Sequence, residues 1–266
     1  MSVLLDLLEK SGISATQAFM LALFLPFLIP FFYFLYRAPR STARPQLRHI
    51  PAYAALKKLL SRAAETGQAV HVSIGTASIA GARTADTTAG LYALEFLADR
   101  AATSGIPPLV TVTDPTTLPA ALDQLRRAYE RQGYPDEYRF DQARFIAPPV
   151  NGSAVPYAAG VMDVLNHEPV AANVMLGAFG DEFLLMTEPA AQRAAYQIGG
   201  TSELSVLPFA QLTMTEPLLG EEIYAAGAYL LQRVGHYTSL VAQDIVRLAL
   251  VLLVLVVVAL RALGIL

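Results

Sequence analysis

Small polar residues and glycines follow the ends of several predicted strands, and their chemistry suits a small ligand. They form three groups: Gly75, Thr76 and Ser78; Asp114; and Gly199, Gly200 and Thr201. Glycine lets a ligand approach backbone N–H groups, and the N-terminus of a following helix favours an anion. We therefore expect that a site for a nucleotide or another small anionic ligand, if the protein has one, is lined by these residues.

The sequence lacks the motifs of the common nucleotide sites. The loop that follows Gly75 is neither a GxGxxG turn nor a P-loop with its Lys-Ser/Thr pair. Ordinary turns and helix caps account for the same glycines, hydroxyls and Asp114 more simply. Both interpretations stay open, and no cofactor is indicated.

No catalytic residue is recognisable either. The chain has no cysteine, which excludes disulfides, thiolate metal sites and cysteine nucleophiles. The four histidines are His49, His71, His167 and His236, and none has the spacing of a metal site. His71 alternates within a predicted strand, so we expect a buried, hydrogen-bonded core residue. No GxSxG elbow is present. The sequence predicts no metal site, and it favours a protein without enzymatic activity over an enzyme.

An alternation of strand and helix patterns positions these residues. Strands are predicted at 69–75, 107–115, 143–149, 171–180 and 195–203. Helices are predicted at 52–66, 84–105, 116–133, 153–168 and 218–235, while 181–194 fits either a helix or a strand and a turn. This order predicts an α/β domain over 52–240, with a Rossmann-like, mostly parallel sheet and helices on both faces. Ligands of such sheets bind outside the carboxyl ends of the strands, where the residues above would meet.

Two apolar segments flank this domain. After an N-terminal segment at 1–17, residues 18–36 carry no charge and are long enough for a retained transmembrane helix. The segment 245–266 contains 13 uncharged residues between Arg247 and Arg261. It predicts a second transmembrane helix if both arginines reach the headgroups. The alternative for this second segment is a buried or interfacial helix.

The charges predict an orientation in the membrane. Residues 37–62, which include a linker at 37–51, contain seven bases and no acid. Such a run marks the cytoplasmic side and could touch anionic headgroups of the lipid bilayer. We therefore expect a protein of a prokaryotic inner membrane with its α/β domain in the cytoplasm. A formal net charge of −3 gives no reason to expect binding to nucleic acid.

The second half of the domain is poor in charge. The 88 residues from 145 to 232 contain nine acids and one base, Arg193. Charge-depleted surface is typical of association interfaces, so we expect a homo-oligomer. The alternative is that this half is simply the buried side of the sheet.

The chain also resembles a known but uncharacterised family. The similar stretches include VHVSIGTASIAG, PPLVTVTDPTTLP, ANVMLGAFGDE and LLGEEIYAAGAYL. They resemble prokaryotic membrane proteins with a domain of unknown function, in which a soluble α/β domain lies between two terminal apolar segments. The resemblance implies an anchor at each end and no reaction. Two hypotheses remain: a membrane-anchored, self-associating scaffold or assembly subunit, and a membrane-tethered α/β domain that binds a small molecule or nucleotide, either as a binding module or as an enzyme.

Overall fold

The structure is a computed structural model that describes residues 14–37 and 47–263. The chain divides into two compact units. One unit runs from Arg48 to Leu231 and holds the whole sheet. The other combines the two ends of the chain, residues 1–47 and 232–266.

The sheet has six strands in the order β3-β2-β1-β4-β5-β6. Their bounds are β1 Ala69–Gly75, β2 Pro108–Val112, β3 Ala143–Phe145, β4 Val170–Ala178, β5 Tyr196–Thr201 and β6 Glu216–Leu219. Every pairing between these strands is parallel. This is the doubly wound order. The chain adds β2 and β3 on one side of β1 and then β4, β5 and β6 on the other, so the switch point lies between β1 and β4, where ligands of such sheets commonly bind. The predicted α/β class is thereby confirmed.

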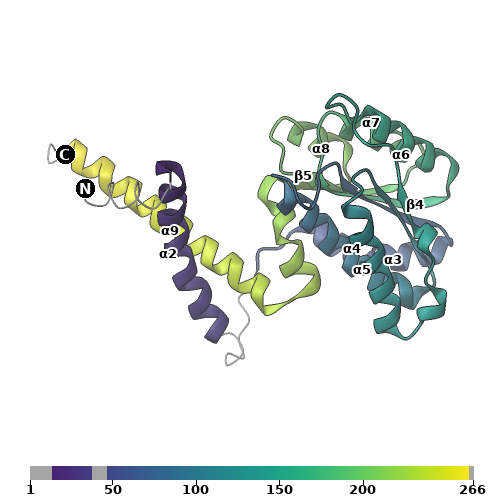
Figure 1. The fold of residues 1–266 in the computed structure, drawn as a ribbon, viewed down its shortest axis with the longest axis horizontal. Coiled ribbons are helices and arrows are strands. Elements are labelled where there is room, and N and C mark those ends of the chain that lie inside the picture. Colours follow the sequence, from purple (N-terminus) through teal and green to yellow (C-terminus); the bar gives the residue numbers. More distant parts are fainter. Residues whose placement is uncertain (1–13, 38–46, 264–266) are drawn as a thin grey trace. The chain divides into compact units, whose positions relative to one another are not determined.

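Helices cover both faces of the sheet (Figure 1). One face carries α3 Pro51–Thr66, α4 Thr84–Ser104 and α5 Thr117–Gln132. The other carries α6 Val155–His167, α7 Glu182–Gln192 and α8 Leu207–Thr213. Alternation along the strands gives each layer its own apolar partners. Met175 on β4 joins Tyr157, Phe179 and Phe183 in the core beneath α6, α7 and α8.

Three details of the sequence-based prediction need correction or completion. The ambiguous segment 181–194 contains a helix, α7. The short helix α8 and the strand β6 were not predicted. The helix expected at 218–235 is wrong: after β6 the chain forms a 3-10 helix, η4 Gly220–Ala225, and then a π-helical turn, η5 Gly227–Leu231.

Contacts with the start of the unit explain this distorted segment. The Tyr53 hydroxyl donates to the carbonyl oxygens of Glu222 at 2.7 Å and Ile223 at 3.2 Å. The Tyr53 ring stacks on Tyr229, with centroids 4.9 Å apart, and Arg48 forms an ion pair with Glu222. The Tyr53 hydroxyl occupies two carbonyl oxygens that an α-helix would use for its own hydrogen bonds, and residues 220–231 form 3-10 and π-helical turns in place of a regular α-helix.

The second unit consists of α2 Ala15–Arg37 packed against α9 Val234–Ala262. Among the described residues, one helix, the 29-residue α9, is long and apolar enough to cross a membrane. It includes most of the predicted C-terminal span, although residues 264–266 lie outside the described part. The range 18–36 lies within α2, which contains Pro26 and Pro30. That α2 also spans a membrane stays a prediction.

Candidate functional site

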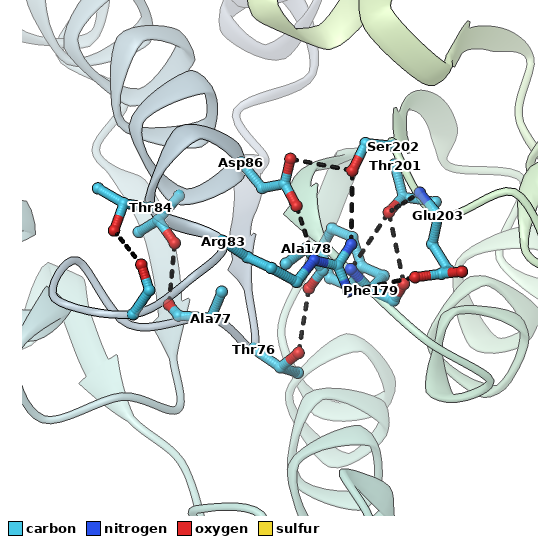
Figure 2. Close-up of polar contacts among 12 residues, drawn as sticks. Thr76, Ala77, Arg83, Thr84, Asp86, Ala178, Phe179, Thr201, Ser202 and Glu203 are labelled. Atoms are coloured by element: carbon cyan, nitrogen blue, oxygen red, sulfur yellow. Dashed lines mark hydrogen bonds and ion pairs between the residues drawn. The ribbon is translucent and has the colours of Figure 1, made fainter. Parts of the chain in front are cut away.

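The predicted ligand residues at the end of β1 hold the sheet together. Gly75 has a φ of 89°, and a Cβ there would overlap the backbone of Ala178. The backbone N–H of Thr76 donates to the Ala178 carbonyl at 2.8 Å, and its hydroxyl donates to the same oxygen at 3.1 Å (Figure 2). At the switch point, therefore, β1 and β4 are joined by the very residues that would approach a ligand.

The glycines of β5 have a similar role. A Cβ on Gly199 would overlap the Met175 carbonyl of β4, and one on Gly200 would overlap the Leu218 carbonyl of β6. Thr201 is buried, and its hydroxyl oxygen accepts the N–H groups of Phe179 and Glu203, each at 3.3 Å. These three residues link β5 to both of its neighbours, so strand pairing is sufficient to explain them.

Asp114 and Ser78 form a separate group over α5. One carboxylate oxygen of Asp114 accepts the N–H groups of Thr116 at 2.8 Å and Thr117 at 3.0 Å, and it also contacts the Thr116 hydroxyl. Partial burial acts to raise the pKa of Asp114, but these hydrogen bonds outweigh it and lower the pKa. Ser78 lies 3.0 Å from the Thr116 hydroxyl. Asp114 is thus a helix cap, and Ser78 joins it through Thr116.

A further polar cluster lies at this edge of the sheet and was missed at the sequence level. Its centre is Asp86, which is only 2% exposed. The Asp86 carboxylate accepts Nε of Arg83 at 2.8 Å, the Ser202 hydroxyl at 2.9 Å and the Tyr224 hydroxyl at 2.6 Å (Figure 2 shows Arg83 and Ser202). Arg83 also pairs with Glu203 at 3.6 Å. Ser202 and Tyr224 are 116 and 138 residues from Asp86, so no local pattern could have found them.

The cluster also affects the N-terminus of α4, the first helix after the switch point. Two of its N–H groups already donate within the preceding loop, Thr84 to Gly81 at 3.3 Å and Asp86 to Arg83 at 3.1 Å. The carboxylate of Asp86 supplies negative charge in the first turn, where a phosphate would otherwise be favoured. An added anion would compete with these contacts, so the arrangement gives little support to a phosphate site.

Histidine and acidic residues do not gather into a metal site. Within residues 14–37 and 47–263, no three His, Cys, Asp or Glu side chains are grouped to hold an ion. His71 is fully buried, with its ring nitrogens 2.7 Å from the Asn173 amide oxygen and 2.9 Å from the Thr111 hydroxyl. Burial lowers the pKa of His71 to about 4, against the smaller opposing effect of the Asn173 hydrogen bond. The prediction of a hydrogen-bonded core histidine is confirmed.

The outer surface of the unit offers a second candidate site. Eleven large apolar side chains of Arg48–Leu231 are exposed, and two of them, Tyr134 and Phe140, precede residue 145. The other nine all lie in the charge-poor half: Phe145, Val150, Val155, Leu184, Leu185, Leu204, Phe209, Leu212 and Tyr224. Burial of β4 and β5 accounts for part of the charge-poor composition. These nine exposed side chains are the part that burial does not explain.

The two helical layers also differ in their charges. On α5, Arg127 pairs with Asp123 at 2.8 Å, and Arg131 pairs with Asp99 of α4 at 2.7 Å. On α7 the exposed residues are Asp181, just before the helix, Leu184, Leu185, Glu188, Ala191 and Gln192. The outer surface of α4 and α5 therefore carries ion pairs within the unit, whereas the exposed surface of α7 is apolar and acidic.

Neither edge strand of the sheet is suited to pairing with a strand of another molecule. Strand β3 has three residues and is followed closely by Pro148 and Pro149. At the other edge, β6 contains Pro217. Short edge strands and prolines limit the addition of another strand. A contact with a partner is therefore better made by the helices.

Comparison with models of protein families assigns the chain to one family. Residues 9–266 match a domain of unknown function, DUF6754. The chain belongs to this family. No curated protein and no solved structure matches it. Membership of DUF6754 agrees with the resemblance to an uncharacterised family, and it assigns no reaction, ligand or functional residue.

Proposed function

We propose that this protein is a membrane-anchored assembly subunit whose α/β unit associates with further copies of itself. The observation that carries the proposal is that nine of the eleven exposed large apolar side chains of the unit lie in its charge-poor half. Burial of apolar surface contributes roughly 25 cal/mol per Å². A surface with few charges loses little solvation when it is covered.

The helices α7 and α8 supply the central part of this surface. They pack against each other and carry Leu184, Leu185, Phe209 and Leu212, with Leu204 just before α8. No charged residue occurs from 204 to 215. We name the surface formed by these five apolar residues the α7–α8 surface, and we propose that it lies at the contact between copies.

The membrane anchors would favour the same association. In this proposal α9 and the predicted span at 18–36 both cross a prokaryotic inner membrane and hold the α/β unit in the cytoplasm. The basic run at 37–62 supports this side because positive residues favour the cytoplasmic face. Copies that share a membrane are concentrated in two dimensions, which adds avidity without new contacts.

Ligand binding is the second candidate function. The observation in its favour is the strand order, which places a switch point between β1 and β4. At that point, however, Gly75, Thr76 and Thr201 are already engaged in contacts between strands and loops. We therefore rank a membrane-tethered binding domain or enzyme below the assembly subunit.

Light scattering of the full chain in detergent tests the proposal. The variant Leu204→Glu/Leu212→Glu changes two side chains that are 77% and 82% exposed, so the core is untouched. We expect the unaltered protein to associate with a dissociation constant of about 10 μM or lower, and the variant to associate at least about tenfold more weakly.

The matched control is Phe140→Glu, because Phe140 is 79% exposed and lies outside the charge-poor half. We expect this variant to associate like the unaltered protein. A monomeric full chain at high concentration, or unchanged association of Leu204→Glu/Leu212→Glu, would contradict the proposal.

A further inference from the structure

We infer that copies of this chain contact one another head to tail, with α7 of one copy packed on α3 of the next. The inference rests on the proposed function and adds the partner surface and its geometry. It comes from two exposed helix faces, one acidic and apolar and the other basic.

The acidic face belongs to α7. Asp181, Leu184, Leu185 and Glu188 are spaced by three and four residues, so they lie in one stripe, and all four are exposed. Neither acid has a cationic partner within the described residues; Glu188 only accepts a hydrogen bond from Gln192 at 3.2 Å. We name these four residues the α7 stripe. Burial of its two leucines against apolar groups would be favourable, and its two carboxylates would have to pair with cations in a contact that buries them.

The basic face belongs to α3. Lys57, Lys58 and Arg62 are exposed on one side of this helix, together with Ser61. The exposed Glu65, the one acid of α3, follows them on the same side near the end of the helix, so this side carries three bases against one acid. None of the three bases pairs with an acid in the part of the chain that the structure describes. The Arg62 guanidinium instead lies 4.7 Å from the centre of the Tyr196 ring. We name Lys57, Lys58, Ser61 and Arg62 the α3 stripe.

The bases of the neighbouring helix α5 behave differently. Arg126, Arg127 and Arg131 all pair with acids on α4 or α5. Besides the single Arg100 of α4, which lies 5.3 Å from the centre of the Phe96 ring, the α3 stripe is therefore where this layer presents cations that form no ion pair with its own acids. Lysine stems are apolar up to the ammonium group, so Lys57 and Lys58 can cover Leu184 and Leu185 while their charges reach Asp181 and Glu188.

The position of the two stripes in the unit decides the geometry of the contact. Helix α3 packs on β4, β5 and β6, and α7 packs on β4 and β5 from the opposite face (Figure 1). The stripes thus lie back to back across the same strands. A contact between different surfaces is heterologous, so each copy keeps one free stripe for a further copy.

A two-fold contact through α7 would be electrostatically worse. It would bring Asp181 and Glu188 close to the same acids of the partner, and like charges that face each other at a contact oppose association. In one membrane all copies are inserted in the same direction along the membrane normal. A rotation axis parallel to that normal relates copies without reversing this direction. The expected product is therefore a ring of more than two copies, or an open array if the rotation does not close.

Paired charge reversals in the full chain, purified in detergent, test this inference. The first variant is Asp181→Lys/Glu188→Lys, which reverses the α7 stripe. The second is Lys57→Glu/Lys58→Glu, which reverses the α3 stripe. We expect each variant alone to associate at least tenfold more weakly than the unaltered chain. Mixed in equal amounts they should associate with each other about as strongly as the unaltered chain does with itself, as measured by light scattering, because each reversed stripe then meets a complementary one.

The matched control is Arg126→Glu/Arg127→Glu, which makes the same change of charge on α5 and should leave association unchanged. If Lys57→Glu/Lys58→Glu associates like the unaltered chain, the head-to-tail contact is wrong although self-association stands. If both variants are weakened but their mixture does not recover, the two stripes do not face each other and the inference is also overturned. If the unaltered chain itself is monomeric, the proposed function fails first.

Discussion

A row of buried polar side chains crosses the sheet beneath α6. Thr111 of β2, His71 of β1, Asn173 of β4 and Gln197 of β5 are all buried, and hydrogen bonds of 2.7–3.3 Å connect them. The strand register explains the row, because His71 is aligned with Asn173 and Asn173 with Gln197. Buried polar groups cost little only when they are all satisfied, so the row fixes the lateral alignment of the strands.

His71 makes stability depend on pH. Its pKa is about 4 in the folded chain and near 6.5 when unfolded, so only the unfolded chain takes up the proton between these values. The contribution is complete above about pH 6.5 and is lost as the pH falls toward 4, at a cost of roughly 3 kcal/mol in the free energy of unfolding. Denaturant unfolding of the full chain in detergent, followed by circular dichroism at several pH values, measures this slope.

The variant His71→Gln isolates this contribution. It should have a shallower decline in stability between pH 6.5 and 5, because glutamine does not titrate. The exposed His167 on α6 provides the control, and His167→Gln should keep the full slope. A slope in His71→Gln that equals that of the unaltered chain would show that another group is responsible.

At the residue level, the sequence places side chains correctly more often than it identifies their partners. Period-two alternation was enough to predict a buried His71. The residues chosen for the ligand site do lie at the carboxyl ends of β1, β2 and β5, as expected. That Thr76 bonds to Ala178, and Ser202 to Asp86, depends on strand order, which no local pattern encodes.

Among the elements, regular and buried segments were predictable and edge segments were not. Strands β1, β4 and β5 are apolar runs that end near glycine, and Gly105 and Gly133 end α4 and α5 as expected. Strand β6 was hidden because Glu216 and Pro217 are poor strand residues, tolerated here at an edge. The helical pattern of 218–235 failed because Tyr53, far away in sequence, bonds to the carbonyls of residues 222 and 223.

The pairing of β5 with β6 depends on Gly200. A Cβ at this position would overlap the Leu218 carbonyl, and backbone atoms cannot move aside as a flexible side chain can. We expect Gly200→Ala to lower the free energy of unfolding by at least about 3 kcal/mol or to prevent folding. Thermal unfolding followed by circular dichroism measures the loss.

The control for this prediction is Gly81→Ala. Gly81 lies in the loop between β1 and α4, and its nearest neighbours would be 3.7 Å from an added Cβ. The change should stay within about 0.5 kcal/mol. If Gly200→Ala is as stable as Gly81→Ala, close strand approach does not explain this glycine.

On the scale of the whole molecule, charge is distributed unequally. Residues 48–144 contain eleven bases and ten acids, whereas 145–231 contain one base and nine acids. The sequence could predict this imbalance but not its placement. The fold places α3 and its three unpaired bases on one face of the sheet, and most of the exposed apolar residues on the other. This two-sidedness, rather than low charge alone, favours an assembly in which unlike surfaces meet.

The same proposal requires that every copy enters the membrane in the same direction, and the basic run predicts which one. Seven bases without an acid at 37–62 should hold the α/β unit in the cytoplasm, with both chain ends outside. The chain has no cysteine, so a single introduced thiol reports only its own position. Ser41→Cys places one in the basic run just after the predicted first span, and Ser11→Cys places one before that span. In spheroplasts, a membrane-impermeant maleimide should label Ser11→Cys at once and Ser41→Cys only after permeabilisation. Labelling of Ser41→Cys in intact spheroplasts would reverse the topology, and protection of both sites would mean that residues 18–36 do not span the membrane.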